Sequence, residues 1–192
     1  MRQRCSRPVV LLLVFAGAGL IPSMARGGDG SKPAEFPQGT WTLELTGSYA
    51  DHIRFSEDRF AFGTVGANYY LWDNLSLGVH LSGYSVDQPH DDGYGLGVEA
   101  FGRLHFLTLD RFTLYFDGGG GKGYFDPETP EFGTHWNYSA KVGFGLTYRI
   151  NEEAWLTGGA RYFHVSNGDQ FGRVNNPSYD GIQYYAGVMI RL

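Results

Sequence analysis

The chain has 192 residues, 29 of them glycine and one cysteine, and aromatic residues make up 16%. So much glycine together with so many aromatic side chains excludes a coiled coil and a disordered chain, and one cysteine excludes an intrachain disulfide framework. The length fits one domain, and the formal net charge of −5 gives no electrostatic reason to bind nucleic acid. An all-β protein is therefore the expectation.

Residues 1–25 are expected to be a signal peptide and not part of the fold. Three arginines precede a run of 13 apolar residues, Val9 to Ile21, and Ser23-Met24-Ala25 then supplies small residues at the positions that a signal peptidase reads. Cleavage there would remove Cys5 and leave 12 basic and 20 acidic residues, a net charge of −8. Residues 26–39, rich in glycine and proline, are expected to form an irregular N-terminal lead-in.

Eight strand-like segments follow in chain order, each with the alternation of residue types that is typical of β-strands. They cover residues 40–50, 59–72, 75–86, 93–107, 112–126, 134–150, 154–166 and 180–192. The connections alternate in length: tight turns are expected at 73–74, around 110–111 and at 151–153, and longer polar loops at 51–58, 87–92, 127–133 and 167–179.

This order of long and short connections is typical of an up-and-down outer-membrane barrel. The expected strands of 11 to 17 residues fit a tilted membrane crossing, which needs roughly 9–11 residues, better than a soluble sandwich, whose strands average about 5–6. Aromatic residues also gather near the strand ends, as in interfacial girdles. We therefore predict that residues 40–192 form an eight-stranded antiparallel transmembrane β-barrel in the cell outer membrane. A soluble, lipocalin-like periplasmic barrel is the alternative.

Two motifs are interpreted as structural. The glycine run at 118–123 formally contains GxGxxG, but it lies inside a predicted strand, where a bend or a crowded barrel wall explains it better than a dinucleotide site. His90-Asp91-Asp92 lacks the spaced ligands of a calcium loop and is interpreted as a solvated loop tip.

A candidate catalytic pair lies at the end of the seventh predicted strand, in residues 161–168 (RYFHVSNG). His164 and Ser166 are two positions apart, so their side chains project from the same face of the strand, roughly 6.5–7 Å apart along it. An imidazole beside a hydroxyl is the arrangement that activates serine as a nucleophile. Asn167 and Gly168 follow, and a side-chain amide and backbone N–H groups are typical oxyanion donors. Strand parity puts the pair on the lipid-facing surface, near the long loops.

The C-terminal part of the chain resembles the lipid A 3-O-deacylase (PagL-like) family. The residues that carry the resemblance are His164-Val165-Ser166-Asn167, Asn176-Pro177 and Asp180-Gly181-Ile182-Gln183, followed by the last strand. The resemblance implies an eight-stranded outer-membrane esterase in which His164 is the general base and Ser166 the nucleophile. It also implies that Asn167, with Gly168 beside it, belongs to the oxyanion site.

This chain differs from the family at the acidic member of the triad. The resemblance implies a glutamate directly after a Gly-Ile pair, and this chain has Gln183 there. Glutamine can hold a histidine by a hydrogen bond but cannot stabilise the imidazolium by charge. Parity also puts Gln183 on the opposite face of the last strand, unless a bulge near Gly181 restores it. Asp180, or Asp169 in the preceding loop, could supply the carboxylate, and Asp180 is the better substitute.

The expected function is that of an outer-membrane esterase that removes an ester-linked acyl chain from lipid A, or from lipopolysaccharide, in the outer leaflet. This chemistry implies no metal and no organic cofactor. Two alternatives stay open. The first is a non-catalytic small barrel with a structural or channel role, which Gln183 favours. The second is a soluble periplasmic lipid-binding barrel, which would fractionate without detergent.

Overall fold

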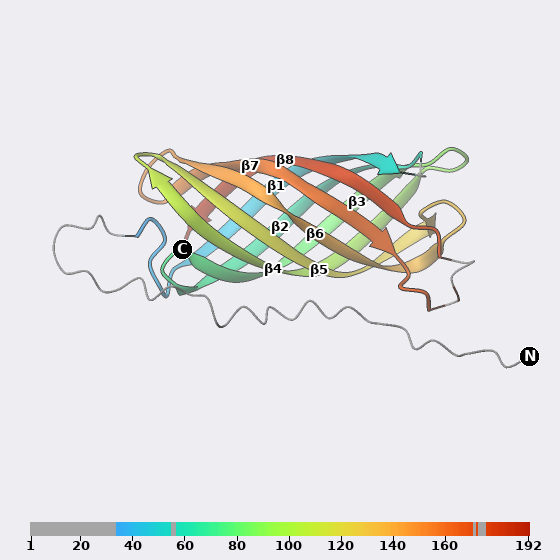
Figure 1. Cartoon of the computed structure of the whole chain (residues 1–192), viewed down its shortest axis with the longest axis horizontal. Helices are drawn as coiled ribbons and strands as arrows, with labels where there is room; N and C mark the ends of the chain where they lie inside the picture. The colour runs from blue at the N-terminus through green and yellow to red at the C-terminus, as the bar shows by residue number, and fades with distance from the viewer. Residues whose placement is uncertain (1–33, 55–56, 171, 173–175) are drawn as a thin grey trace, which may run out of the picture. The chain divides into compact units, whose positions relative to one another are not determined.

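The computed structural model describes residues 34–54, 57–170, 172 and 176–192, which form a closed antiparallel β-barrel (Figure 1). Its strands are β1 (Trp41–Arg54), β2 (Arg59–Trp72), β3 (Leu75–Asp87), β4 (Gly93–Leu109), β5 (Phe112–Thr129), β6 (Thr134–Arg149), β7 (Ala154–Ser166) and β8 (Tyr179–Arg191). Each strand pairs with its neighbours in sequence, and β1 pairs with β8 to close the barrel. The predicted signal peptide, residues 1–25, and the first part of the predicted lead-in lie outside the described residues.

The predicted fold class is confirmed, and each predicted strand overlaps an observed one. The two largest differences are strand ends that were placed too early. β1 continues past residue 50 because Asp51 and His52 still pair with β8, and β5 continues past residue 126 to Thr129, which pairs with Thr134 of β6. Both extensions are polar or contain proline, so they look like loops in the sequence.

The barrel exposes apolar residues and buries polar ones. In β3, Leu77, Val79 and Leu81 are each more than half exposed, at 54%, 57% and 60%, whereas His80 and Ser82 are buried. An apolar exterior is what a lipid-facing wall requires, and it is opposite to the surface expected of the soluble alternative. Among the described residues there is no helix of the length and apolar character needed to cross a membrane.

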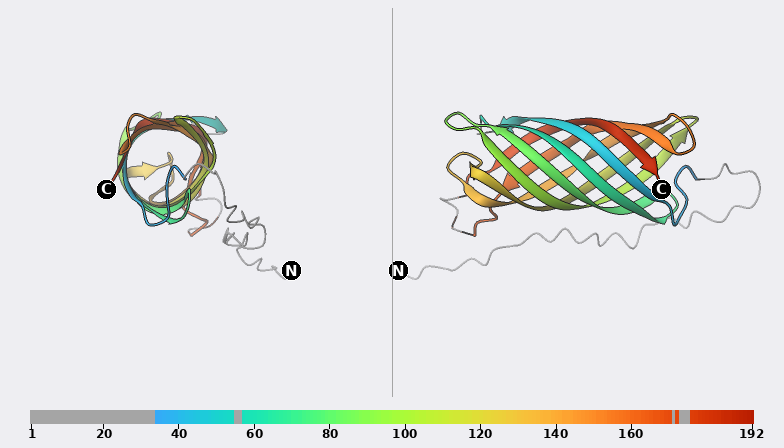
Figure 2. Two further views of the ribbon diagram at one scale, coloured as in Figure 1. Left: turned by 90° about the vertical axis from the view of Figure 1, so that its left-hand side faces the viewer. Right: turned by 180° about the vertical axis from the view of Figure 1, so that it is seen from behind.

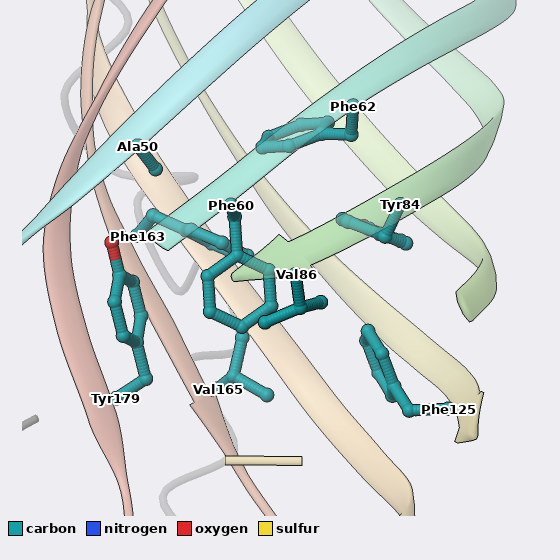
Figure 3. Close-up of a cluster of buried hydrophobic side chains, with 9 residues drawn as sticks. All are labelled: Ala50, Phe60, Phe62, Tyr84, Val86, Phe125, Phe163, Val165 and Tyr179. Atoms are coloured by element: carbon teal, nitrogen blue, oxygen red, sulfur yellow. The ribbon is translucent and has the colours of Figure 1, made fainter. Parts of the chain in front are cut away.

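The barrel interior is filled by three layers of side chains. An apolar cluster lies at the end with the long loops (Figure 3); its members are Ala50, Phe60, Phe62, Tyr84, Val86, Phe125, Phe163, Val165 and Tyr179. A second apolar cluster at the end with the tight turns contains Phe36, Tyr70, Trp155 and Met189. Between them lies a layer of buried charges, here called the interior ion-pair layer: Glu44, Glu99, Arg103, Asp117, Lys141 and Arg161.

The interior ion-pair layer joins strands across the barrel. Arg103 lies 2.6 Å from Glu44 and 3.1 Å from Asp117, and Arg161 lies 2.5 Å from the same Asp117 carboxylate. Lys141 lies 2.8 Å from Glu99. Such charges are tolerated in a barrel interior because each is paired with an opposite charge and hydrogen-bonded.

The described part of the lead-in lies at the turn end of the barrel (Figure 2). Phe36 is fully buried, with its ring centroid 5.0 Å from that of Tyr70 and 4.9 Å from that of Trp155. Glu35 accepts a hydrogen bond of 2.7 Å from the Trp155 indole N–H and lies 3.3 Å from Arg149. The described part of this segment forms no strand, and it is packed into the barrel.

The glycine run lies inside β5, as expected from the sequence. A Cβ added at Gly119 or Gly121 would collide with the backbone carbonyls of Ala100 and Val98 on β4. The two glycines therefore allow the close approach of β4 and β5, which supports the crowded-wall interpretation.

Candidate active site

His164 and Ser166 project from the outer side of the barrel wall at the end of β7. Their neighbours Phe163 and Val165 point inward, into the apolar cluster at the loop end (Figure 3). Side chains alternate along a strand, so the two polar residues face the other way. The long loop that follows β7 begins directly after Ser166.

The pairing of β7 with β8 brings a carboxylate to this surface. The register places His164 opposite Asp180, with no irregularity between the two strands. Tyr179 points inward into the apolar cluster, so Asp180 shares the outer face with His164. Directly opposed residues of an antiparallel pair have Cβ atoms only about 4.5–5.5 Å apart, close enough for a hydrogen bond between short side chains.

The three side chains form a continuous hydrogen-bonded array. His164 Nε2 lies 2.9 Å from Ser166 Oγ, and His164 Nδ1 lies 2.8 Å from Asp180 Oδ1. An ionised carboxylate can only accept, so Nδ1 carries the proton and donates it to Asp180. Nε2 of the neutral imidazole is then the acceptor for the Ser166 hydroxyl, which is the tautomer that a general base requires.

Tyr162 adds a fourth group to the array. Its hydroxyl donates a hydrogen bond to Oδ1 of Asp180, the oxygen that also accepts from His164. Tyr162 is two residues before His164, so the period of the strand puts both on one face. That parity was visible in the sequence, but nothing there indicated that the phenol meets the carboxylate.

The site is partly covered and opens to the outer surface of the wall. Ser166 is 8% exposed, while the side chains of His164 and Asp180 are 33% and 21% exposed. Two hollows at the loop rim, both lined by Gln88, involve none of these three residues.

Gln183 points into the barrel, away from His164. Its side chain is buried, and its amide donates a hydrogen bond of 2.9 Å to Ser48 Oγ. β8 keeps a regular register against β7 through Gly181; the irregularity in this region is in β1, between His52 and Arg54. No bulge in β8 turns the glutamine outward, so the residue at the family's acid position does not contact the histidine.

The loop after Ser166 turns sharply and is held by amide groups. Gly168 and Asp169 both have positive φ angles, 68° and 61°. The Asn167 backbone N–H donates a hydrogen bond of 2.9 Å to Oδ1 of Asn176. Nδ2 of the same Asn176 side chain donates a hydrogen bond of 2.7 Å to Oδ1 of Asp169. Asp169 is thus engaged in stabilising the loop, and the structure does not bring it to His164. Asn167 and Gly168 stay next to Ser166.

His90 lies at a loop tip, as interpreted from the sequence, and its ring contacts Glu131 of the neighbouring loop. In the part of the chain that the structure describes, no three histidine, cysteine or carboxylate side chains are grouped so as to hold a metal ion.

Solved structures with the same fold are outer-membrane barrels. The outer-membrane enzyme PagL is 15% identical over 76% of this chain and 97% of its own, with a TM-score of 0.57. Neisserial surface protein A is 15% identical over 80% of this chain and 96% of its own, with a TM-score of 0.60. The N-terminal barrel domain of OprF from Pseudomonas aeruginosa is 16% identical over 81% and 98%, with a TM-score of 0.53. At these identities the likeness shows the fold alone.

Comparison at the level of sequence gives the family. No curated protein sequence matches the chain. The model of the PagL family, described as lipid A 3-O-deacylase, matches residues 40–188, nearly the whole barrel. The resemblance seen at the C-terminal motif is thereby confirmed, and this chain belongs to the PagL family of lipid A 3-O-deacylases.

Proposed function

We propose that the chain is a serine esterase that hydrolyses an ester-linked acyl chain of lipid A in the outer leaflet, with Ser166, His164 and Asp180 as its catalytic triad. The observation that carries the proposal is the position of the His164 ring, which is hydrogen-bonded to a serine hydroxyl on one side and to a carboxylate on the other. The family gives the ester at the 3-O position as the target.

In the first half of the reaction, Ser166 Oγ attacks the ester carbonyl while His164 Nε2 takes the hydroxyl proton. The tetrahedral intermediate collapses and breaks the bond between the carbonyl carbon and the sugar oxygen. The leaving sugar hydroxyl receives the proton from the imidazolium. In the second half, water attacks the acyl-enzyme with His164 again as base, which releases the fatty acid and restores the serine.

Asp180 is the acidic member of the proposed triad. Its carboxylate holds His164 with the proton on Nδ1 and stabilises the positive charge that the imidazole gains during attack. Because Asp180 stands directly opposite His164 in the β7–β8 register, it makes this contact without any distortion of β8. With Asp180 in this role, the proposed triad is complete without a carboxylate at position 183.

The negative charge on the tetrahedral intermediate needs donors beside Ser166. The Asn167 side-chain amide and the Gly168 backbone N–H are the groups that we assign to this role, since both follow the nucleophile directly. The left-handed conformation at Gly168 turns the chain back at this point, and a Cβ at Gly168 would come within 3.3 Å of the Tyr138 ring. Glycine is therefore the residue that suits this position.

The position of the site in the wall fits a lipid substrate. Ser166 is the last residue of β7, next to the long loops, and Trp136 and Tyr138 on the neighbouring strand are exposed as interfacial aromatics are. Ester bonds of a lipid lie between its acyl chains and its headgroup, which is the depth that such aromatics mark.

Mass spectrometry of lipid A from cells that express the chain tests the proposal. The wild type is expected to remove one acyl chain, and Ser166→Ala, at equal abundance in the outer membrane, is expected to leave lipid A unchanged. Trimming by both proteins, or by neither, would contradict the proposal.

A fluorophosphonate probe separates the proposal from the non-catalytic alternative. Purified, refolded protein is expected to be labelled at Ser166, and the labelling is expected to disappear in His164→Ala. Gln183 was the feature that favoured a non-catalytic barrel, and the contact between Asp180 and His164 supplies the missing carboxylate. An absence of labelling in the folded wild-type protein would favour the inert barrel.

A further inference from the structure

Lys122 is a charged residue on the lipid-facing wall of β5. It is exposed, whereas Asp117 and Phe125 of the same strand are buried and point into the barrel at odd-numbered positions. The alternation of β5 therefore directs Lys122 outward. A charge on this surface is unfavourable in the middle of a bilayer and becomes tolerable only near the headgroups.

The surroundings of Lys122 keep its charge available. Its Nζ lies 5.1 Å from the ring centroid of Trp136 and 5.4 Å from that of Tyr138, so the ammonium group rests over two aromatic faces. Over the described residues, Lys122 makes no ion pair with a carboxylate, in contrast to the interior Lys141, which pairs with Glu99 at 2.8 Å. Aromatic faces attract a cation but do not neutralise it.

The β-sheet register connects Lys122 with the proposed active site. Ser166 pairs with Tyr138, and Tyr138 pairs with Lys122 on the next strand. Two strand spacings separate Lys122 from Ser166, so the backbones of the two residues lie about 10 Å apart across the outer wall. A further link comes from Gln170, whose amide donates a hydrogen bond of 2.7 Å to the Tyr138 hydroxyl and so ties the loop after Ser166 to the aromatic pair.

We propose that Lys122 binds a phosphate group of a lipid whose ester lies at Ser166. A phosphate monoester carries a charge of about −1.5 to −2 near pH 7 and presents three strong acceptor oxygens, and lysine binds such groups as a point charge. The distance across the wall suits a sugar that carries an ester on one carbon and a phosphate on another. The identification of this lipid as the substrate rests on the esterase function proposed above.

Two glucosamine lipids test the proposal, one with an ester-linked acyl chain and a phosphate at C1, the other identical but without phosphate. Both are presented in neutral maltoside micelles. Wild-type protein is expected to prefer the phosphorylated lipid in kcat/KM, and Lys122→Gln is expected to reduce this preference about tenfold, the size of one charge-assisted contact. Lys122→Arg is expected to restore most of it. Arg111→Gln, which removes an exposed charge at the turn end, is the matched control and is expected to keep the preference.

A binding measurement keeps this proposal separate from the esterase proposal. In ³¹P NMR titrations, Ser166→Ala protein is expected to bind the phosphorylated lipid about tenfold more tightly than the Ser166→Ala/Lys122→Gln double variant. Failure of the wild type to hydrolyse either lipid would overturn the esterase function alone, because this binding difference would still be readable. Equal binding by the two variants, together with an unchanged preference in Lys122→Gln, would overturn the phosphate site.

The phosphate could belong to the reacting lipid or to its neighbour in the leaflet. Adding an ether-linked phosphate lipid, which has no ester to cleave, to micelles of the phosphate-free substrate distinguishes the two sources. Faster cleavage that depends on Lys122 in this mixture would identify a neighbouring lipid as the ligand. No acceleration, with the preference for the phosphorylated substrate intact, would identify the phosphate of the substrate itself.

Discussion

Two polar networks occupy opposite sides of the same barrel wall. The interior ion-pair layer joins permanent charges, with Arg103 and Arg161 sharing the Asp117 carboxylate out of contact with solvent. The outer array joins Ser166, the ring of His164 and Asp180, and it is partly exposed. In the first network the charges cancel one another, which holds strands together. In the second, the imidazole of His164 lies between a hydroxyl and a carboxylate, the arrangement on which the proposed proton transfer depends. The two networks differ in solvent access and in kind of partner, and not in the number of hydrogen bonds, so a hydrogen-bond count alone does not single out the candidate site.

The largest expected effect on activity comes from Asp180→Asn. An amide at this position cannot stabilise the imidazolium, and it can hold the histidine in the wrong tautomer; the corresponding change in a serine protease lowers kcat by about 10⁴. We expect a loss of kcat of about 10³- to 10⁴-fold in a micellar ester assay. Gln183→Leu is the matched control on the same strand, and it is expected to keep kcat within about twofold while losing the contact with Ser48, worth about 1 kcal/mol of stability. If Gln183→Leu abolished activity and Asp180→Asn did not, the assignment of the acid would be wrong.

The second-largest expected effect is a loss of stability, and it tests the interior ion-pair layer. Asp117→Ala leaves two buried guanidinium groups without their shared carboxylate, and breaking a buried pair in this way costs about 3–5 kcal/mol. Urea unfolding of the barrel in lipid vesicles, followed by tryptophan fluorescence, measures the loss. Asp180→Ala removes a carboxylate from the outer wall and is expected to cost less than about 1 kcal/mol. Equal losses in the two variants would remove the distinction between the networks.

The smallest effect is expected from Tyr162→Phe. The phenol holds the carboxylate of Asp180 without touching the reacting atoms, so it is a positioning residue whose removal is expected to lower kcat about ten- to fifteenfold, the low end of the value of one hydrogen bond to a charged group. KM is expected to stay the same, because the substrate contacts are retained. A rise in KM at constant kcat would instead assign Tyr162 to substrate binding.

Much of the fold was predictable because alternation is a local property. Leu77, Val79 and Leu81 show it within five residues, and a barrel repeats the pattern in every strand. The strand ends were less predictable, since residues such as Asp51 and His52 pair beyond the apolar part of the wall, where polar side chains look like a loop.

The outer face of β7 was predictable in the same way, and parity alone puts Gln183 on the other side of β8. Asp180 could be named from the sequence as the better substitute for the acid, but its contact with His164 needed the β7–β8 register, which depends on the length of a loop and not on a local pattern. The contact between Glu44 and Arg103 joins β1 and β4, which are far apart in the chain, so no sequence spacing predicts it.

The burial of Phe36 and Glu35 at the turn end bears on the route to the proposed site. Together with the interior ion-pair layer and the apolar cluster at the long loops, these residues fill the barrel interior with packed side chains and compensated charge. Such an interior contrasts with the water-filled lumen of a porin. A substrate of the proposed site would therefore approach from the lipid around the barrel and not along the barrel axis.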